Sequence, residues 1–203
     1  MEDKRLNEKE SLELIAQMIQ NTRKNLDAGS GNMFLLWGYV SALIALVVFA
    51  GVYFTKNPVW MWGFWGIPVV GYTLSYFLLW KQQKPVRTYV DKVLADAWKY
   101  LGVLCMVFVV GATYTNTFET ILPLCAILLS VGSIFTGAVI RQTSFFALPG
   151  LGVVLGMNMF FDVWDKTASY FILLEFALVV IFSMIIPGHI LNNKVRKEIK
   201  NRK

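Results

Sequence analysis

Long apolar runs with almost no charged residues alternate with short polar connectors along the chain. A membrane-spanning helix needs about 20 mainly apolar residues, because the hydrocarbon core is about 30 Å thick and a helix rises about 1.5 Å per residue. The pattern therefore predicts an all-α, polytopic membrane protein with six transmembrane helices in three hairpins. The predicted spans cover residues 33–54, 59–80, 98–116, 118–140, 143–161 and 167–190.

Residues 1–32 are too polar to enter a membrane and have the periodicity of an amphipathic helix. Asn7 and Glu10 fit a helix-capping pair at its start. Residues 29–31, Gly-Ser-Gly, predict its end, because glycine adopts the left-handed conformation that terminates helices. The apolar face carries Leu12, Ile15, Met18, Ile19 and Leu26. We expect residues 7–28 to lie on the cytoplasmic membrane surface or on a protein partner.

Residues 86–98 form a second amphipathic segment, with apolar residues at i, i+3, i+4 and i+7 spacing. Oppositely charged residues four positions apart, such as Arg87 and Asp91, lie on its polar face. We expect this helix to continue into the third span. Two interpretations stay open: the segment rests on lipid headgroups, or it is a coupling surface for a cytoplasmic protein partner.

Basic residues are distributed unequally between the predicted connectors. With six spans both termini lie on one side, which then holds 17 of the 19 Lys and Arg, against Lys56 and Lys166 on the other. Basic residues are retained in the cytoplasm, so both termini are predicted to be cytoplasmic. The composition agrees with a membrane location, since only 16% of residues are charged, compared with about 25% in soluble domains.

The basic tail, residues 191–203, is expected to attract anionic lipid. Nucleic acid is not an expected partner, because no aromatic stacking residues accompany these charges. One His and two Cys leave little material for a metal site, and no cofactor is expected. Counting along the predicted spans places Cys105 and Cys125 at depths about 8 Å apart, beyond the range of a disulfide. We therefore expect two separate, buried apolar side chains.

Glu175 is the most informative side chain, because it is ionisable and is predicted about eight residues inside the sixth span. Such residues usually face the bundle interior, a cavity or a partner. Asn158, near the outer end of the fifth span, is expected to approach it. The two form a candidate intramembrane polar site for a proton, a cation or a ligand. The alternative is a hydrogen-bonded glutamic acid that joins two helices.

Three further acidic residues, Glu119, Asp162 and Asp165, are predicted on the outer side. They form either a vestibule that attracts cations or ordinary polar loops. His189, at the inner end of the sixth span, is expected to cap the helix C-terminus, where a cation is favoured. Within the fifth span, Gly152 and Gly156 have the spacing that predicts close helix packing.

Three segments resemble a known group of proteins. They are residues 25–32 (Asn-Leu-Asp-Ala-Gly-Ser-Gly-Asn), 34–40 (Phe-Leu-Leu-Trp-Gly-Tyr-Val) and 187–192 (Pro-Gly-His-Ile-Leu-Asn). On these residues the chain resembles an uncharacterised family of bacterial six-helix inner-membrane proteins. The resemblance implies an architecture and a location in the bacterial inner (plasma) membrane. It implies no catalytic residues, because that family has no established activity.

The chain contains no recognisable enzyme motif. We therefore expect a non-enzymatic membrane partner or regulatory subunit, which presents residues 7–28 and 86–98 to a cytoplasmic protein. The alternative is a transport subunit for a small solute or cation, which uses Glu175 and Asn158.

Overall fold

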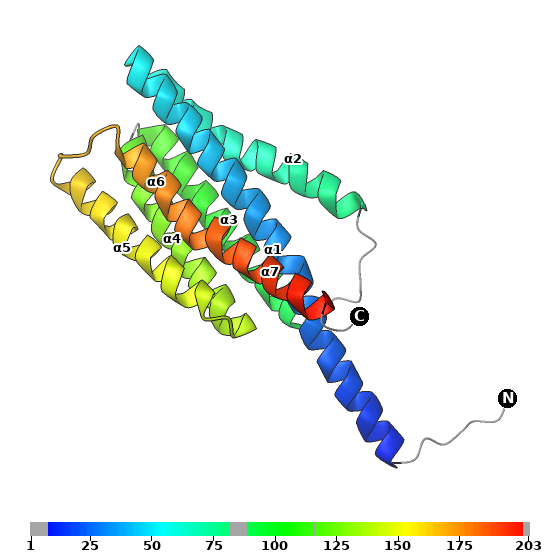
Figure 1. Ribbon diagram of the computed structural model, residues 1–203. Coiled ribbons are helices and arrows are strands. Elements are labelled where there is room, and N and C mark those ends of the chain that lie inside the picture. The colour runs from blue at the N-terminus through cyan, green and yellow to red at the C-terminus, as the bar shows by residue number, and fades with distance from the viewer. Residues whose placement is uncertain (1–7, 82–88, 116, 201–203) are drawn as a thin grey trace.

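The computed structural model describes residues 8–81, 89–115 and 117–200, and every regular element within them is a helix (Figure 1). The elements are α1 (Glu8–Thr55), η1 (Pro58–Trp65), α2 (Gly66–Lys81), α3 (Tyr89–Thr115), α4 (Phe118–Ile140), α5 (Ser144–Trp164), α6 (Ile172–Val180), η2 (Ile181–Ile185) and α7 (Ile186–Lys200). Here η1 is a 3₁₀ helix and η2 is a short π-helix. Because α6, η2 and α7 follow one another without a break, residues 172–200 form one long helix, which we call the central helix.

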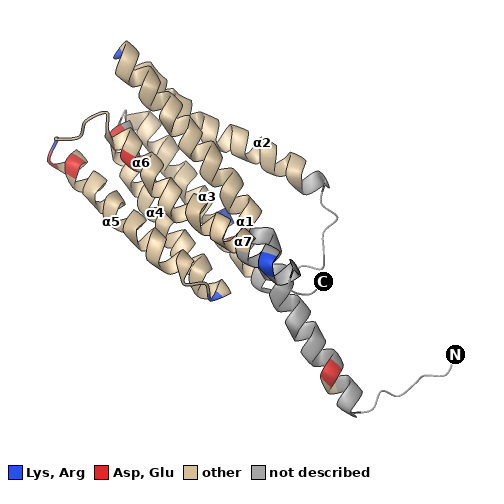
Figure 2. Cartoon of the chain, viewed as in Figure 1, with Lys and Arg blue, Asp and Glu red and all other residues tan. Residues whose placement is uncertain are grey.

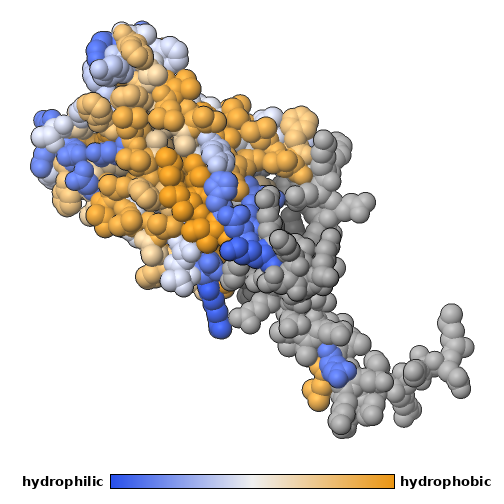
Figure 3. Space-filling view, in the orientation of Figure 1, coloured by the Kyte–Doolittle hydropathy of each residue, from blue (hydrophilic) through white to orange (hydrophobic). Residues whose placement is uncertain are grey.

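Five helical stretches in the described part of the chain are long and apolar enough to cross a membrane. They are Gly31–Thr55, Lys92–Thr115, Glu119–Ile140, Ser144–Trp164 and Ile172–Asn193. Figure 3 shows a largely hydrophobic surface over the bundle, and large side chains such as Phe77, Val107 and Tyr114 are exposed. Exposed apolar surface of this extent marks contact with a membrane. These are the helices of a multi-pass membrane protein.

The predicted second span is not a single α-helix. Its first part is the 3₁₀ helix η1, and only Gly66–Lys81 is α-helical, so it is not one of the five long stretches. The Asn57 side chain begins η1 by accepting a hydrogen bond from the Val59 N–H at 3.0 Å. A 3₁₀ helix rises about 2.0 Å per residue and an α-helix about 1.5 Å, so the two elements have a combined length of about 40 Å. That length is sufficient to cross the hydrocarbon core.

The predicted end of the N-terminal helix at residues 29–31 is wrong, because α1 continues through them as one helix of 48 residues. None of the described glycines has a positive φ, so none adopts the terminating conformation. Gly31 is instead buried where α1 meets α7, and a Cβ there would overlap the Asn192 side chain. The N-terminal part of α1 extends away from the bundle (Figure 1). The predicted cap, Asn7, lies outside the described residues.

The central helix is the most buried element. In its apolar stretch 61% of residues are buried, against 6% in that of α3. It packs against α1, α4 and α5, whereas α3 packs mainly on α4, and α2 packs on α1 and η1. Consequently α2 and α3 are the peripheral helices of the bundle.

Small residues allow α4, α5 and the central helix to approach closely. A Cβ on Gly156 would lie 2.8 Å from Ile127 Cγ1, and one on Gly152 would lie 2.6 Å from Ser130 Oγ and overlap Ser183 Oγ. The two serine hydroxyls hydrogen-bond to each other at 2.8 Å. The close packing predicted at this glycine pair is confirmed.

The described part of the second amphipathic segment continues into α3 without a break, as predicted; residues 86–88 lie outside the described residues. Its apolar face packs on the bundle. Leu94 is buried, and the Trp98 ring meets Phe34 edge-on with centroids 5.1 Å apart. Trp98 Nε1–H also donates to Thr136 Oγ1 at 3.0 Å. This face is therefore covered by the chain's own α1 and α4.

Candidate functional site

Glu175 lies nearer to a helix end than the sequence predicted. Residues 167–171 form an irregular connection instead of helix, so Glu175 falls in the first turn of α6. The connection folds back on α5, where the N–H groups of Thr167 and Ala168 donate to the Asp162 carbonyl at 2.9 and 3.0 Å. The helix dipole favours a carboxylate in the first turn. An ionised Glu175 therefore costs less free energy at this position than it would eight residues inside a helical span.

Asn158 and Asp162, four residues apart on α5, lie beside Glu175. Asn158 Nδ2 donates to Asp162 Oδ2 at 3.3 Å, and both side chains lie within electrostatic range of the Glu175 carboxyl. Glu175 Oε2 itself is buried and has no hydrogen-bond partner. Of the predicted polar and vestibule residues, the structure brings these three together.

Glu119 and Asp165 are exposed, the first in the opening turn of α4 and the second directly after α5. Figure 2 shows acidic residues at the end of the bundle where α5 joins α6. No hydrogen bond among the described residues connects Glu119 or Asp165 to Glu175. The ammonium group of Lys56 lies at the same end. Its Nζ is 4.5 Å from the centroid of the Tyr53 ring and 4.9 Å from that of the Tyr170 ring.

His189 does not cap a helix, because α7 continues through it to Lys200. Its Nε2 lies 2.7 Å from Tyr39 Oη, and the two rings meet edge-on. A second polar contact between the same helices joins Asn192 Nδ2 to Asn32 Oδ1 at 2.8 Å. His189 thus helps to fasten the central helix to α1. The predicted tail also begins within α7, and residues 201–203 lie outside the described residues.

A cavity of about 580 Å³, which we call the chamber, lies between the two peripheral helices and the rest of the bundle. Its volume is within the range of small-molecule sites, about 300–1,000 Å³. The walls come from α1, η1, α2, α3, α4 and the central helix, and they are mainly apolar. Aromatic lining residues include Phe34, Trp37, Trp65, Tyr72, Trp98 and Phe176. None of the predicted site residues belongs to this lining.

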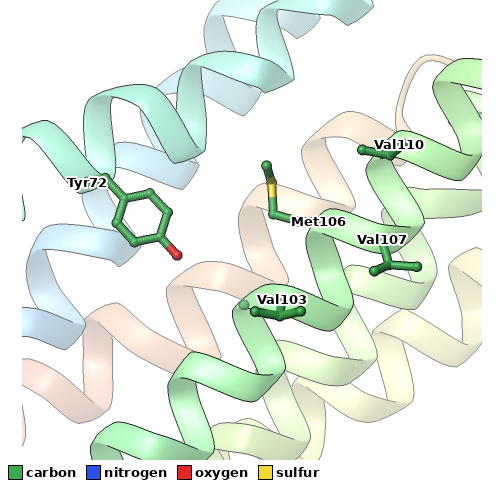
Figure 4. Close-up of a pocket in the computed structure, with 6 residues that line it drawn as sticks. Tyr72, Val103, Met106, Val107 and Val110 are labelled. Atoms are coloured by element: carbon green, nitrogen blue, oxygen red, sulfur yellow. The ribbon is translucent and has the colours of Figure 1, made fainter.

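A second cavity adjoins the chamber on the side of α3. It has a volume of about 320 Å³ and shares Tyr72, Gly102 and Met106 with the chamber. Figure 4 shows Tyr72 reaching from α2 toward α3, which carries Met106 and Val103. A Cβ on Gly102 would lie 3.6 Å from Tyr72 Oη, at ordinary contact distance. We call these three shared residues the portal, because they line both cavities.

Trp65 contributes an unpaired polar group to the chamber wall. Its Nε1 is buried and has no hydrogen-bond partner. An indole N–H can only donate, and leaving a buried donor unpaired costs about 1–3 kcal/mol.

Cys105 of α3 and Cys125 of α4 both line the chamber, and both are free thiols. α3 begins at Tyr89, nine residues before the predicted span, so a depth counted from the start of that span does not describe Cys105.

One feature of the sequence could have indicated the chamber. Six of the seven tryptophans lie near the ends of predicted spans, where they are expected to anchor the protein at the membrane interface. Trp65 is the exception, because it lies six residues inside the second span. A buried tryptophan usually finds a partner for its N–H, so a tryptophan at that depth indicates a polar contact or a ligand.

Comparisons with protein-family models, with curated proteins and with solved structures gave no match for this chain. Within residues 8–81, 89–115 and 117–200, no group of three or more His, Cys, Asp or Glu is placed to hold a metal ion. The functional argument therefore rests on the chamber, its portal and the groups in its wall.

Proposed function

We propose that this protein binds a small, bilayer-soluble organic molecule in the chamber between α2 and α3. The observation that carries the proposal is an apolar cavity of about 580 Å³, with a second cavity that shares the portal residues and is lined by exposed residues of α3. A binding site of this kind is typically apolar with a few polar groups that fix orientation. The Trp65 N–H is such a group, so the ligand is expected to carry an acceptor oxygen as well as an apolar body.

The direction of access follows from the packing. α2 rests on α1 and η1, and α3 rests on α4, so the chamber lies between two separately supported helices. The portal residue Tyr72 and the adjoining Val103 and Val107 of α3 are exposed. A molecule dissolved in the acyl-chain region would therefore reach the chamber without crossing water.

We place this function in a regulatory membrane protein without enzymatic activity. Charge distribution supports six crossings with both termini in the cytoplasm, and the resemblance described above supports a bacterial inner membrane. The extension of α1 beyond the bundle (Figure 1) favours residues 7–28 as the surface for a cytoplasmic protein partner. Residues 86–98 are less favoured, because Leu94 and Trp98 already pack within the chain. The basic residues at the C-terminal end are proposed to attract anionic lipid.

The test uses a saturated C16 acyl probe that carries a photoreactive diazirine, added to the purified protein in lipid nanodiscs. Binding in the chamber predicts labelling that saturates with probe concentration. Gly102→Leu places a branched side chain at the portal and should abolish the saturable labelling. Gly111→Leu is the matched control on the same helix, because a Cβ there meets nothing within 4 Å, and it should label like the wild type.

Labelling that rises linearly with probe concentration in the wild type would contradict chamber binding, because it indicates random contact with the outer surface. Equal saturable labelling in the Gly102→Leu protein would also contradict it.

A second candidate function, transport of a cation or proton, is favoured by the buried, unpaired Glu175 Oε2 beside Asn158 and Asp162. For this function, Glu175→Gln should abolish coupled flux in proteoliposomes while the protein stays folded. Asp165→Asn is the control, since Asp165 is exposed and should leave flux unchanged. Folded Glu175→Gln protein with wild-type flux, or a wild type without flux, would rule this function out.

A further inference from the structure

The chamber extends over much of the length of the bundle. The residues that line it run from Leu94 to Val109 on α3 and from Ile121 to Thr136 on α4. Each of these two stretches covers about 22 Å, because an α-helix rises about 1.5 Å per residue. An extended chain of single bonds advances about 1.2 Å per bond, so a C16 acyl chain measures about 18 Å. The chamber is therefore long enough for one such chain.

One end of the chamber carries a positive charge. Among the described residues that line the chamber, Lys99 of α3 is the charged one. It is also exposed, so it lies at the edge of the chamber. The same end contains Trp98 and Thr136, which hydrogen-bond to each other at 3.0 Å, whereas Val109 and Ile121 make the opposite end apolar.

The charge of Lys99 is not neutralised within the part of the chain that the structure describes, where no salt bridge to Lys99 is formed. A lysine ammonium group is a compact point charge with three hydrogen-bond donors. It binds a phosphate or a carboxylate through charge-assisted hydrogen bonds. Lys99 is therefore suited to hold an anionic group that comes from outside the chain.

We propose that the ligand of the chamber is an anionic acyl lipid, whose chain lies along α3 and α4 and whose head group binds Lys99. The inference rests on the proposed function, because it names the class of molecule that the chamber binds. It adds a charged end to the apolar body and the acceptor oxygen already expected of the ligand.

Charge and polarity favour this class among molecules that dissolve in a bilayer. A neutral molecule gains nothing from the charge of Lys99, and a cationic one is repelled by it. A charge buried without a partner in an apolar cavity is costly, so the head group of an anionic lipid should stay at the exposed end beside Lys99. The acyl chain then occupies the apolar remainder of the chamber.

The experiment compares two competitors that differ only in charge, monopalmitoylglycerol and its phosphate ester. Each is titrated against the photoreactive acyl probe on the full-length protein in phosphatidylcholine nanodiscs, at neutral pH and physiological ionic strength. The measured quantity is the competitor concentration that halves the saturable labelling. We expect the phosphate ester to compete about fivefold more strongly than the neutral lipid, which is the upper end for ion pairs that water reaches.

Substitutions of Lys99 test whether this preference comes from its charge. Lys99→Gln should remove the preference by weakening competition by the phosphate ester alone, and unchanged competition by the neutral lipid will show that the chamber is intact. Lys99→Arg should keep the preference. Lys92→Gln is the matched control, because Lys92 is an exposed lysine two turns earlier on α3 that does not line the chamber. It should behave like the wild type.

The outcomes separate this inference from the proposed function. Equal competition by the two lipids in the wild type, or an undiminished preference in the Lys99→Gln protein, would overturn the inference and leave chamber binding intact. An equal loss of preference in the Lys92→Gln protein would assign it to the basic surface as a whole, and would also overturn the inference. If the probe never labels saturably, the proposed function fails and the inference fails with it.

Discussion

Replacing Gly152 by alanine tests whether α5 approaches α4 and the central helix as closely as the structure indicates. The new Cβ would overlap Ser183 Oγ and lie 2.6 Å from Ser130 Oγ. Overpacking of this kind costs about 1–3 kcal/mol. Loss of the hydrogen bond between the serines adds about 0.6 kcal/mol, the average for such bonds in membrane proteins.

Gly150→Ala is the matched control, because it lies on the same helix and its Cβ would meet nothing within 4 Å. Both substitutions gain about 0.5–1 kcal/mol of helix preference, which cancels when the two variants are compared. The Gly152→Ala protein should therefore be less stable than the Gly150→Ala protein by about 1.5–3.5 kcal/mol. Reversible unfolding in mixed detergent micelles, followed by tryptophan fluorescence, measures this difference. Equal stability of the two variants would refute the close approach.

Two further predictions concern the peripheral helix and the topology. Trp98→Phe and Thr136→Val each remove the 3.0 Å hydrogen bond between α3 and α4. A double-mutant cycle of unfolding free energies should therefore give a coupling energy of about 0.6 kcal/mol. Additive effects of the two substitutions would show that the bond contributes nothing to stability. Six crossings place both termini on one side, whereas five place them on opposite sides, so reporters fused at each terminus decide whether η1 and α2 cross together. We expect cytoplasmic signals from both termini, and an outside signal from a reporter at Asn57; termini on opposite sides would show that this segment does not cross.

The helices themselves were largely readable from the sequence. The fourth predicted span has the bounds of α4, Phe118–Ile140, because Glu119 in the first turn and Arg141 directly after the helix mark the ends of an apolar run of the right length. The break predicted at residues 29–31 was wrong because glycine serves two purposes. The Gly-Ser-Gly sequence suggested a helix end. In the structure, Gly31 instead allows α1 to approach Asn192 of α7, because a Cβ on Gly31 would overlap the Asn192 side chain.

The positions of the candidate sites were less predictable, because depth was counted along ideal straight spans. Glu175 lies in the first turn of α6 and not deep in a span, because backbone hydrogen bonds to Asp162 hold the preceding residues in an irregular connection. Cys105 and Cys125 line the same chamber, which a count along each single span does not show. Six elements pack around the chamber. The hydrophobic periodicity of any single element does not reveal a cavity between several of them. The position of Trp65, six residues inside the second predicted span, is a sequence signal that could have indicated it.

The central claim is that a bilayer-soluble molecule occupies the chamber, and mapping the photolabelled residues tests it most directly. At saturating probe, we predict that mass spectrometry finds the label on lining residues such as Met106 and Trp65. Excess unlabelled C16 acyl lipid should remove it, and Gly102→Leu should prevent it. Label confined to exposed positions such as Phe77 and Tyr114, unchanged by competitor, would contradict the account.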